Sequence, residues 1–256
     1  MSNKLNTDNE LANYAIGLGD DSLIIGQRLA EWCSNGPFLE EDIAISNISL
    51  DFIGRASMFY QYACEVDGNG HTEDDIAFAR DAREYTNLMI FELPIGDFAF
   101  TMVRQMVLDI FSLAFLEKLQ QSNDEQFRAI ADKAIKEARY HLRRSADWVI
   151  RLGDGTAESK QRAQAALDEV WGFTHELFEV HASEKALIEQ GIAVDRSQLK
   201  AQWDSKINDV LAQATLTRPV DDWSTNGGRD GLHTEHLGHL LTELQFMQRA
   251  YPDMTW

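Results

Sequence analysis

The chain has 256 residues, of which 44% are hydrophobic and 10% aromatic, so it can build a large folded core and is not a disordered segment. Its formal net charge of -19, from 42 acidic and 23 basic residues, repels phosphate groups. This charge disfavours nucleic acid, anionic membranes and polyanionic cofactors as partners, whereas a basic protein fits better.

Apolar residues recur at spacings of three and four along most of the chain, which predicts helices and no strands. Only four prolines occur, so long helices are not interrupted by missing backbone donors. Asp8 precedes the first apolar run, and residues 122–125 are typical of a stop followed by a new N-cap. Long helices are predicted at 11–33, 40–66, 97–121 and 125–152, and shorter ones at 73–80, 84–92, 158–189, 197–214 and 233–250.

Four long helices joined by short breaks are typical of a bundle. We therefore predict an all-α helical bundle with additional C-terminal helices, folded as a single domain over residues 1–256. Its core is expected at about 8–152 and the additional helices at about 158–250. The glycine-rich segment 218–231 has no preceding strand and no P-loop lysine, so we interpret it as a linker and not as a phosphate-binding loop.

Polar residues interrupt the apolar faces of all four long helices. A buried carboxylate is costly unless it is paired, hydrogen-bonded or bound to a metal, so these residues predict a polar site or network in the bundle core. The candidate positions are Gln27, Glu31, Asp51, Gln105, Asp109, Glu137, Arg139 and His141.

A di-iron carboxylate bundle takes one Glu from each of two helices and a Glu-x-x-His pair from each of the other two. No glutamate stands three residues before any histidine in this chain. Asp51 is followed at that spacing by Gly54, and His141 is preceded by Ala138, so each pair lacks a donor. We interpret these four positions as degenerate ligand positions.

Two interpretations of the polar core follow. The favoured one is a satisfied hydrogen-bond and ion-pair network, or side chains that partly face solvent, and an inward Arg139 would itself compete for the carboxylates. The alternative is a self-sufficient ferritin-like metalloprotein with an atypical metal site made of Asp51, Asp109, Glu137 and His141.

His233, His236 and His239 follow one another at spacings of three, along one helical stripe. A surface transition metal is chemically feasible there, but no carboxylate or thiol is arranged to complete a closed site. We favour capping and packing at the start of the last helix. Cys33 and Cys64 lie in apolar helical stretches without a companion thiol, which predicts two reduced core cysteines in a cytoplasmic protein.

Targeting and membrane signals are not expected. The first ten residues are polar and lack the apolar stretch of a signal peptide. No window approaches ~20 uncharged apolar residues, so no membrane-spanning segment is predicted. No nucleophile motif of the Gly-x-Ser-x-Gly or Cys-His kind stands out either.

Extended blocks of the chain resemble the PaaC family, the C subunits of the multicomponent phenylacetyl-CoA ring-epoxidising monooxygenases of bacterial phenylacetate degradation. The resemblance covers nearly the whole chain. The blocks that carry it are 18–21, 27–33, 47–56, 133–142, 191–195 and 231–238.

The resemblance implies a ferritin-like fold and a non-catalytic, structural role beside a related catalytic A subunit. That A subunit is expected to hold the di-iron centre and bind phenylacetyl-CoA. A small B subunit is implied as well, together with a reductase whose flavin and iron-sulfur groups deliver electrons from NADPH. This chain is then expected to hold no cofactor, and no catalytic residue is assigned to it. We expect a homodimer as the form without the partner, and a stand-alone homo-oligomeric scaffold is a third hypothesis.

Overall fold

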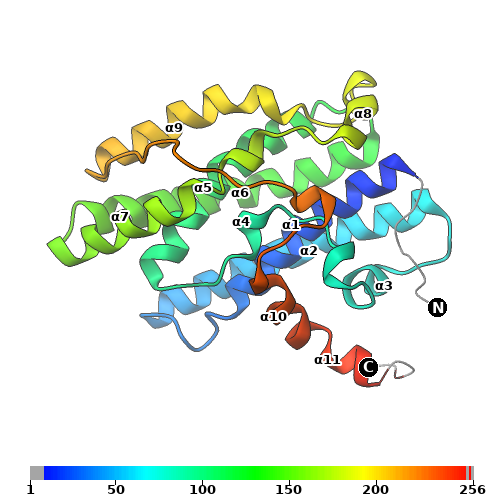
Figure 1. Ribbon diagram of the computed structural model, residues 1–256, viewed down its shortest axis with the longest axis horizontal. Coiled ribbons are helices and arrows are strands. Elements are labelled where there is room, and N and C mark those ends of the chain that lie inside the picture. The colour runs from blue at the N-terminus through cyan, green and yellow to red at the C-terminus, as the bar shows by residue number, and fades with distance from the viewer. Residues whose placement is uncertain (1–8, 252–253, 255–256) are drawn as a thin grey trace. The chain divides into compact units, whose positions relative to one another are not determined.

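The structure of the protein, a computed structural model, describes residues 9–251 and 254, and these residues form helices without strands (Figure 1). The prediction of an all-α fold is confirmed. The chain divides into two compact units, one made of Met1–Pro94 and Gly227–Trp256 and the other of Ile95–Asn226. The single ferritin-like domain over 1–256 stays a prediction.

The first unit is built on two long antiparallel helices. The two helices, α1 and α2, run side by side (Figure 1), and the last segment of the chain returns to this unit. Its elements are α1 (Glu10–Ala30), α2 (Leu39–Asp67), α3 (Glu73–Phe78), η1 (Ala82–Glu84), α4 (Met89–Glu92), η5 (Gly228–Asp230), α10 (Glu235–Leu244) and α11 (Phe246–Ala250).

The second unit is built on another long pair, α5 and α6, against which α7 and α9 pack. Asp124 begins α6 as an N-cap, because its side chain accepts a hydrogen bond from the backbone of Phe127 at 2.9 Å, as the sequence predicted. The elements are α5 (Phe98–Leu119), α6 (Glu125–Gly153), α7 (Ala157–Trp171), η2 (His175–Phe178), η3 (Ala182–Glu184), α8 (Lys185–Glu189), η4 (Arg196–Leu199) and α9 (Lys200–Gln213).

Close approach of α1 and α2 depends on glycine. A Cβ atom added at Gly19 would lie 2.4 Å from the ring of Tyr60, so no larger residue fits without a shift of that ring. Further along, the hydroxyl of Ser49 donates to the carbonyl of Gly26 at 2.8 Å. The first unit therefore places the polar face of α1 directly beside the aromatic residues of α2.

The prediction of one continuous helix over residues 158–189 was wrong. The helix ends at Trp171, because the side chain of Trp223 covers Gly172 and the hydroxyl of Thr174 donates to the carbonyl of Trp171 at 2.7 Å. The predicted helix 233–250 is also divided, at the buried Gln245. The first helix is capped by Asn9, whereas Asp8, which was predicted to precede it, lies outside the described residues.

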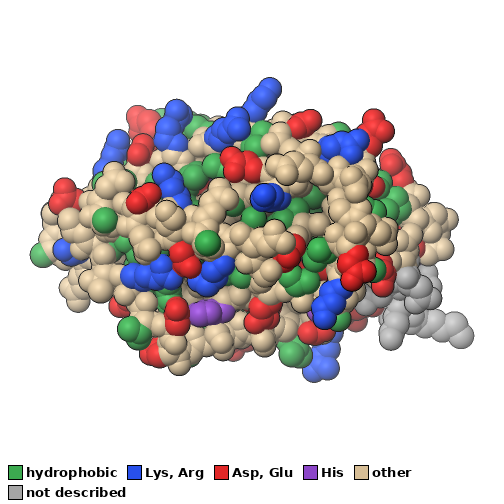
Figure 2. Space-filling view, turned by 90° about the horizontal axis from the view of Figure 1, so that it is seen from above, with side chains coloured by type: hydrophobic (Ala, Val, Ile, Leu, Met, Phe, Trp, Pro, Cys, Tyr) green, Lys and Arg blue, Asp and Glu red, His purple; other side chains and the backbone are tan. Residues whose placement is uncertain are grey.

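In the described part of the chain, α5 alone is long and apolar enough to cross a membrane by length and composition, although Arg104 and Asp109 interrupt its apolar sequence. Within the protein, 89% of its most apolar window is buried, as in the core helix of a soluble protein. Figure 2 shows basic and acidic side chains interspersed over one face of the molecule, with hydrophobic groups in small separate clusters.

Candidate functional site

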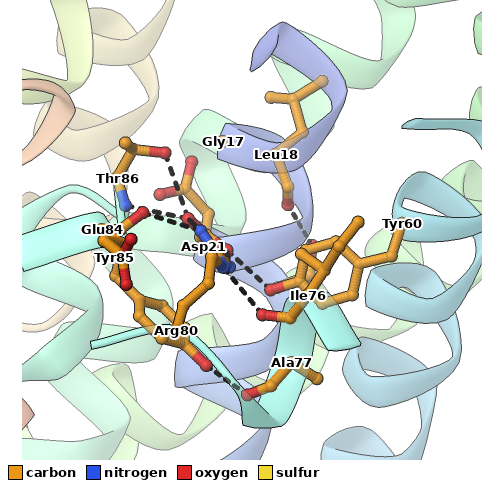
Figure 3. A network of polar contacts seen from close by, with 12 residues as sticks. Gly17, Leu18, Asp21, Tyr60, Ile76, Ala77, Arg80, Glu84, Tyr85 and Thr86 are labelled. Atoms are coloured by element: carbon orange, nitrogen blue, oxygen red, sulfur yellow. Dashed lines mark hydrogen bonds and ion pairs between the residues drawn. The ribbon is translucent and has the colours of Figure 1, made fainter. Parts of the chain in front are cut away.

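The most extensive buried polar network of the first unit surrounds Asp20 in the middle of α1. Asp20 and Arg80 are both fully buried and form a salt bridge in which both guanidinium nitrogens donate to the carboxylate. The hydroxyl of Tyr60 donates to the same carboxylate at 2.7 Å, and the backbone amide of Thr86 donates at 2.8 Å. In Figure 3, Tyr60 from α2 and Arg80 and Thr86 from the segment that follows α3 converge on α1.

Arg80 uses its remaining donors on backbone carbonyls, those of Ile76 at 2.7 Å and Glu84 at 2.8 Å. Its guanidinium also lies 4.1 Å from the ring centroid of Tyr85. Burial opposes the charge of Arg80, but the Asp20 carboxylate outweighs this effect and raises the pKa of the guanidinium. The buried charge of Arg80 is therefore matched by a carboxylate and by hydrogen bonds to backbone carbonyls, the condition under which buried charges are tolerated.

The two tyrosines beside this pair stay protonated. Burial and the nearby Asp20 carboxylate raise the pKa of Tyr60 well above its ordinary value. Burial raises the pKa of Tyr85 to about 12. Neither phenol is ionised near neutral pH, so both remain hydrogen-bond donors within the network.

A second salt bridge joins the last segment of the chain to α1. Arg229 binds the carboxylate of Asp21 through two nitrogens, at 3.0 and 2.5 Å, and also donates to the carbonyl of Gly17 at 3.1 Å. The same carboxylate accepts from the backbone amide of Leu88 at 2.9 Å. The predicted linker 218–231 therefore supplies, through the half-buried Arg229, an ionic contact to α1.

A third contact fixes the start of α10. The fully buried Glu92 accepts from Asn87 at 2.9 Å and lies 2.8 Å from Nδ1 of His233. Nε2 of His233 lies 2.9 Å from the carbonyl of Tyr85, which can only accept a hydrogen bond, so this nitrogen carries a proton. With a carboxylate at the other nitrogen, the geometry favours the imidazolium.

Burial opposes the charge on His233, but hydrogen bonding and attraction from the Glu92 carboxylate outweigh it and raise the pKa of His233. A folded-state pKa above the unfolded value of about 6.5 stabilises the fold fully below that pH, and the contribution is lost as pH rises through the folded-state pKa. We therefore expect the Tm difference between wild type and His233→Gln to be larger at about pH 6 than at about pH 9.

His239→Gln is the matched control for this measurement, because His239 is exposed on α10. Its Tm difference from wild type should not change with pH in the same way. An equal effect of His233→Gln at both pH values would contradict the ionised pair.

The positions predicted for a polar core fall in both units. In the second unit Gln105, Asp109 and His141 are buried, and Asp109 accepts from Gln105 at 3.0 Å and from the hydroxyl of Ser145 at 2.7 Å. Glu137 is half-buried. In the first unit Gln27 and Asp51 are half-buried.

Two of the candidate polar positions, Glu31 and Arg139, are exposed, as is the degenerate ligand position Gly54, and the favoured interpretation allowed for side chains that partly face solvent. Glu31 lies at the C-terminal end of α1 and binds Arg28 at 2.7 Å, Arg139 lies on the outer side of α6, and Gly54 is exposed on α2. The helical register turns these positions outward, and the exposed Glu31 carboxylate reaches back to the buried Arg28. Gln105, Asp109 and His141 match the predicted burial, and Ala138 is buried as well.

The cysteines also differ from their prediction as core residues. Cys33 is exposed and Cys64 is half-buried, and both are free thiols. Cys33 follows the last turn of α1, where the chain leaves the packed face of the helix. Burial, with nearby acidic residues, raises the pKa of Cys64 to about 11, so its thiol stays protonated.

These residues do not fit a di-iron centre. A cluster requires four inward carboxylates and two imidazoles, whereas Ala138 and Gly54 supply no donor and Glu31 points to solvent. The Asp109 carboxylate already accepts two hydrogen bonds from side chains. Among residues 9–251 and 254, no group of three or more His, Cys, Asp or Glu side chains could hold a metal ion. His233, His236 and His239 therefore do not form such a group.

Sequence reasoning missed the network around Asp20 and Asp21. Two adjacent aspartates inside the apolar run of α1 were a signal that could have found it, since an isolated carboxylate pair in such a run needs buried cations. Arg80 and Arg229, 60 and 208 residues away along the chain, gave no comparable local signal.

Comparison with known proteins places this chain among phenylacetate-degradation proteins. A family model described as "Phenylacetic acid catabolic protein" matches residues 2–256. A relative from Escherichia coli (strain K12), named as the C subunit of 1,2-phenylacetyl-CoA epoxidase, is 46% identical over 248 residues. That alignment covers 97% of this chain and 100% of the relative.

Proposed function

Because this chain belongs to the phenylacetic acid catabolic protein family, we propose that it is a structural subunit of a multicomponent di-iron monooxygenase. The complex would epoxidise the aromatic ring of phenylacetyl-CoA in phenylacetate degradation. In this role the chain is not an enzyme by itself, and it supports a related catalytic A subunit.

The observation that carries the proposal is the occupation of the candidate ligand positions by ordinary hydrogen bonds. The buried carboxylate of Asp109 accepts from Gln105 and Ser145, and the residue three before His141 is alanine. A metal would have to displace these donors and would still lack a ligand on each Glu-x-x-His position. These buried hydrogen bonds therefore support a structural role for the chain.

The net charge of the chain supports the same roles for this chain and the A subunit. A formal net charge of -19 opposes direct binding of the anionic coenzyme A moiety, which is expected to bind the A subunit. The small B subunit and a reductase with flavin and iron-sulfur groups complete the proposed assembly, with NADPH as the electron source. The di-iron centre belongs to the A subunit in this scheme.

Reconstitution tests the proposal. The A subunit, B subunit and reductase are mixed with NADPH and phenylacetyl-CoA, with and without this chain, and epoxide formation is followed by mass spectrometry. We expect epoxide only when the chain is present. Elemental analysis of the purified chain after incubation with ferrous iron should show negligible bound iron, because its donor set is incomplete.

The control replaces the chain with the same amount of heat-denatured chain, which should not restore turnover. Full epoxidation without the chain would refute the supporting role. Two tightly bound irons in the isolated chain, with epoxidation in the absence of the A subunit, would instead favour the self-sufficient metalloprotein.

A further inference from the structure

The outward face of α2 carries a row of exposed apolar side chains. Leu39, Ile43 and Leu50 are 72%, 52% and 64% exposed, and Gly54 continues the row. The spacings of four, seven and four residues place all four positions on one side of the helix. We call these four residues the α2 outer stripe. It extends for about 22 Å along the helix at about 1.5 Å per residue.

Gly54 gives the stripe a second distinguishing feature. It lies inside the 29-residue helix α2, and no atom of the chain lies within 4 Å of the place where its Cβ would be. Glycine destabilises a helix interior relative to alanine, so the folding of this chain alone gives no reason for it. A glycine on an exposed face allows the backbone of another molecule to approach closely.

The charged residues that accompany the stripe along α2 are all acidic. Residues 38–54 contain Glu40, Glu41, Asp42 and Asp51 and no lysine, arginine or histidine. Two copies of this surface would bring carboxylates against carboxylates, which opposes self-association through it. A partner with basic residues beside an apolar ridge would satisfy both the apolar row and its acidic border.

We propose that the α2 outer stripe is the surface that binds the A subunit, through a helix of that subunit whose apolar ridge is flanked by lysine and arginine side chains. The inference rests on the proposed function, since it is that function which supplies a permanent protein partner. The apolar residues provide the buried contact, Gly54 sets the distance between the two helices, and the acidic border fixes the orientation.

Binding measurements test this surface. The Kd of wild type, Leu50→Asp and Leu232→Asp for the purified A subunit is measured by isothermal titration calorimetry. Leu232 is the matched control, because it is a leucine of the same unit with a similar exposure of 59%. We expect the Kd to rise at least about tenfold for Leu50→Asp and to stay within about twofold for Leu232→Asp. Both variants should keep the circular dichroism and Tm of wild type.

The substitution Gly54→Ala distinguishes the effect of Gly54 on the stability of the chain from its effect on binding. In the isolated chain it should raise Tm by about 2–4 °C, because alanine is the better helix former. The affinity for the A subunit should fall in the same variant. A higher Tm with unchanged affinity would overturn the close approach at Gly54.

The chemistry of the partner is tested by charge. Glu40→Lys should weaken binding, and the Kd of wild type should rise with ionic strength, because both changes reduce attraction to a basic border. A Kd that is independent of salt would overturn the basic partner helix.

The outcomes distinguish this inference from the proposed function. If the A subunit does not bind wild type and does not need the chain for turnover, both fail. If the A subunit binds and needs the chain, but Leu50→Asp binds as well as Leu232→Asp, the stripe alone is refuted. Sedimentation that shows a homodimer dissociated by Leu50→Asp, with A-subunit binding unchanged, would refute it in favour of a second copy.

Discussion

Replacement of Asp20 by alanine is expected to lower the free energy of unfolding by about 3–5 kcal/mol, because it leaves Arg80 charged and fully buried without its carboxylate. The same substitution removes the acceptor for Tyr60 and for the backbone amide of Thr86. Urea unfolding followed by circular dichroism measures the change. A loss below about 1 kcal/mol would contradict the role of the pair.

The double variant Asp20→Ala/Arg80→Met tests whether the loss in Asp20→Ala comes from the unpaired charge of Arg80. Removing both charges avoids an uncompensated buried cation, so the double variant should be more stable than the sum of the two single losses indicates. Arg162→Ala is the matched surface control. Arg162 binds Asp97 and Glu158, but its side chain is 55% exposed, so the free energy of unfolding should hardly change.

Replacement of Trp203 by alanine is expected to destabilise the second unit by about 3–5 kcal/mol. Trp203 is completely buried, its ring lies 5.7 Å from that of Trp171 and 5.3 Å from that of Phe178, and its indole nitrogen donates to the carbonyl of Val107 at 3.0 Å. The side chain therefore connects α9 to α5 and to the aromatic residues around η2.

Trp203→Phe keeps most of the apolar contact and loses the hydrogen bond, so we expect a smaller loss of about 1–2 kcal/mol. Trp223→Ala is the control for tryptophan removal, since Trp223 is 45% exposed, and its effect should be well below that of Trp203→Ala. Equal losses at the two tryptophans, measured by urea unfolding, would show that Trp203 is not a central packing residue.

Periodicity and stop signals were sufficient to predict the long helices, because an amphipathic pattern over 20 or more residues has few competing explanations. They failed where a contact distant in sequence ends a helix. Nothing local at Gly172 indicates that Trp223 will cover it, and nothing at Gln245 indicates that its amide will donate to the carbonyl of Arg80 at 3.0 Å.

Site prediction failed in a related way. Spacing identified Asp109 and His141 as buried polar residues of apolar helices, but it did not distinguish them from Glu31 at the end of α1 and Arg139 in the middle of α6, which are both exposed. The buried Asp20 and Arg80 pair requires knowledge of which cation approaches a given carboxylate. That information lies in tertiary packing, which the sequence pattern of one helix does not contain.

The return of the chain end to the first unit has a consequence for biosynthesis. Asp21 and Arg229 are 208 residues apart, and Glu92 and His233 are 141 apart, so a ribosome must synthesise the chain beyond residues 229 and 233 before these ionic contacts close. The intervening residues 95–226 are contiguous and complete their own packing earlier. A variant that lacks residues 227–256 would leave the carboxylates of Asp21 and Glu92 without Arg229 and His233, so it should unfold more readily and be degraded faster in cells.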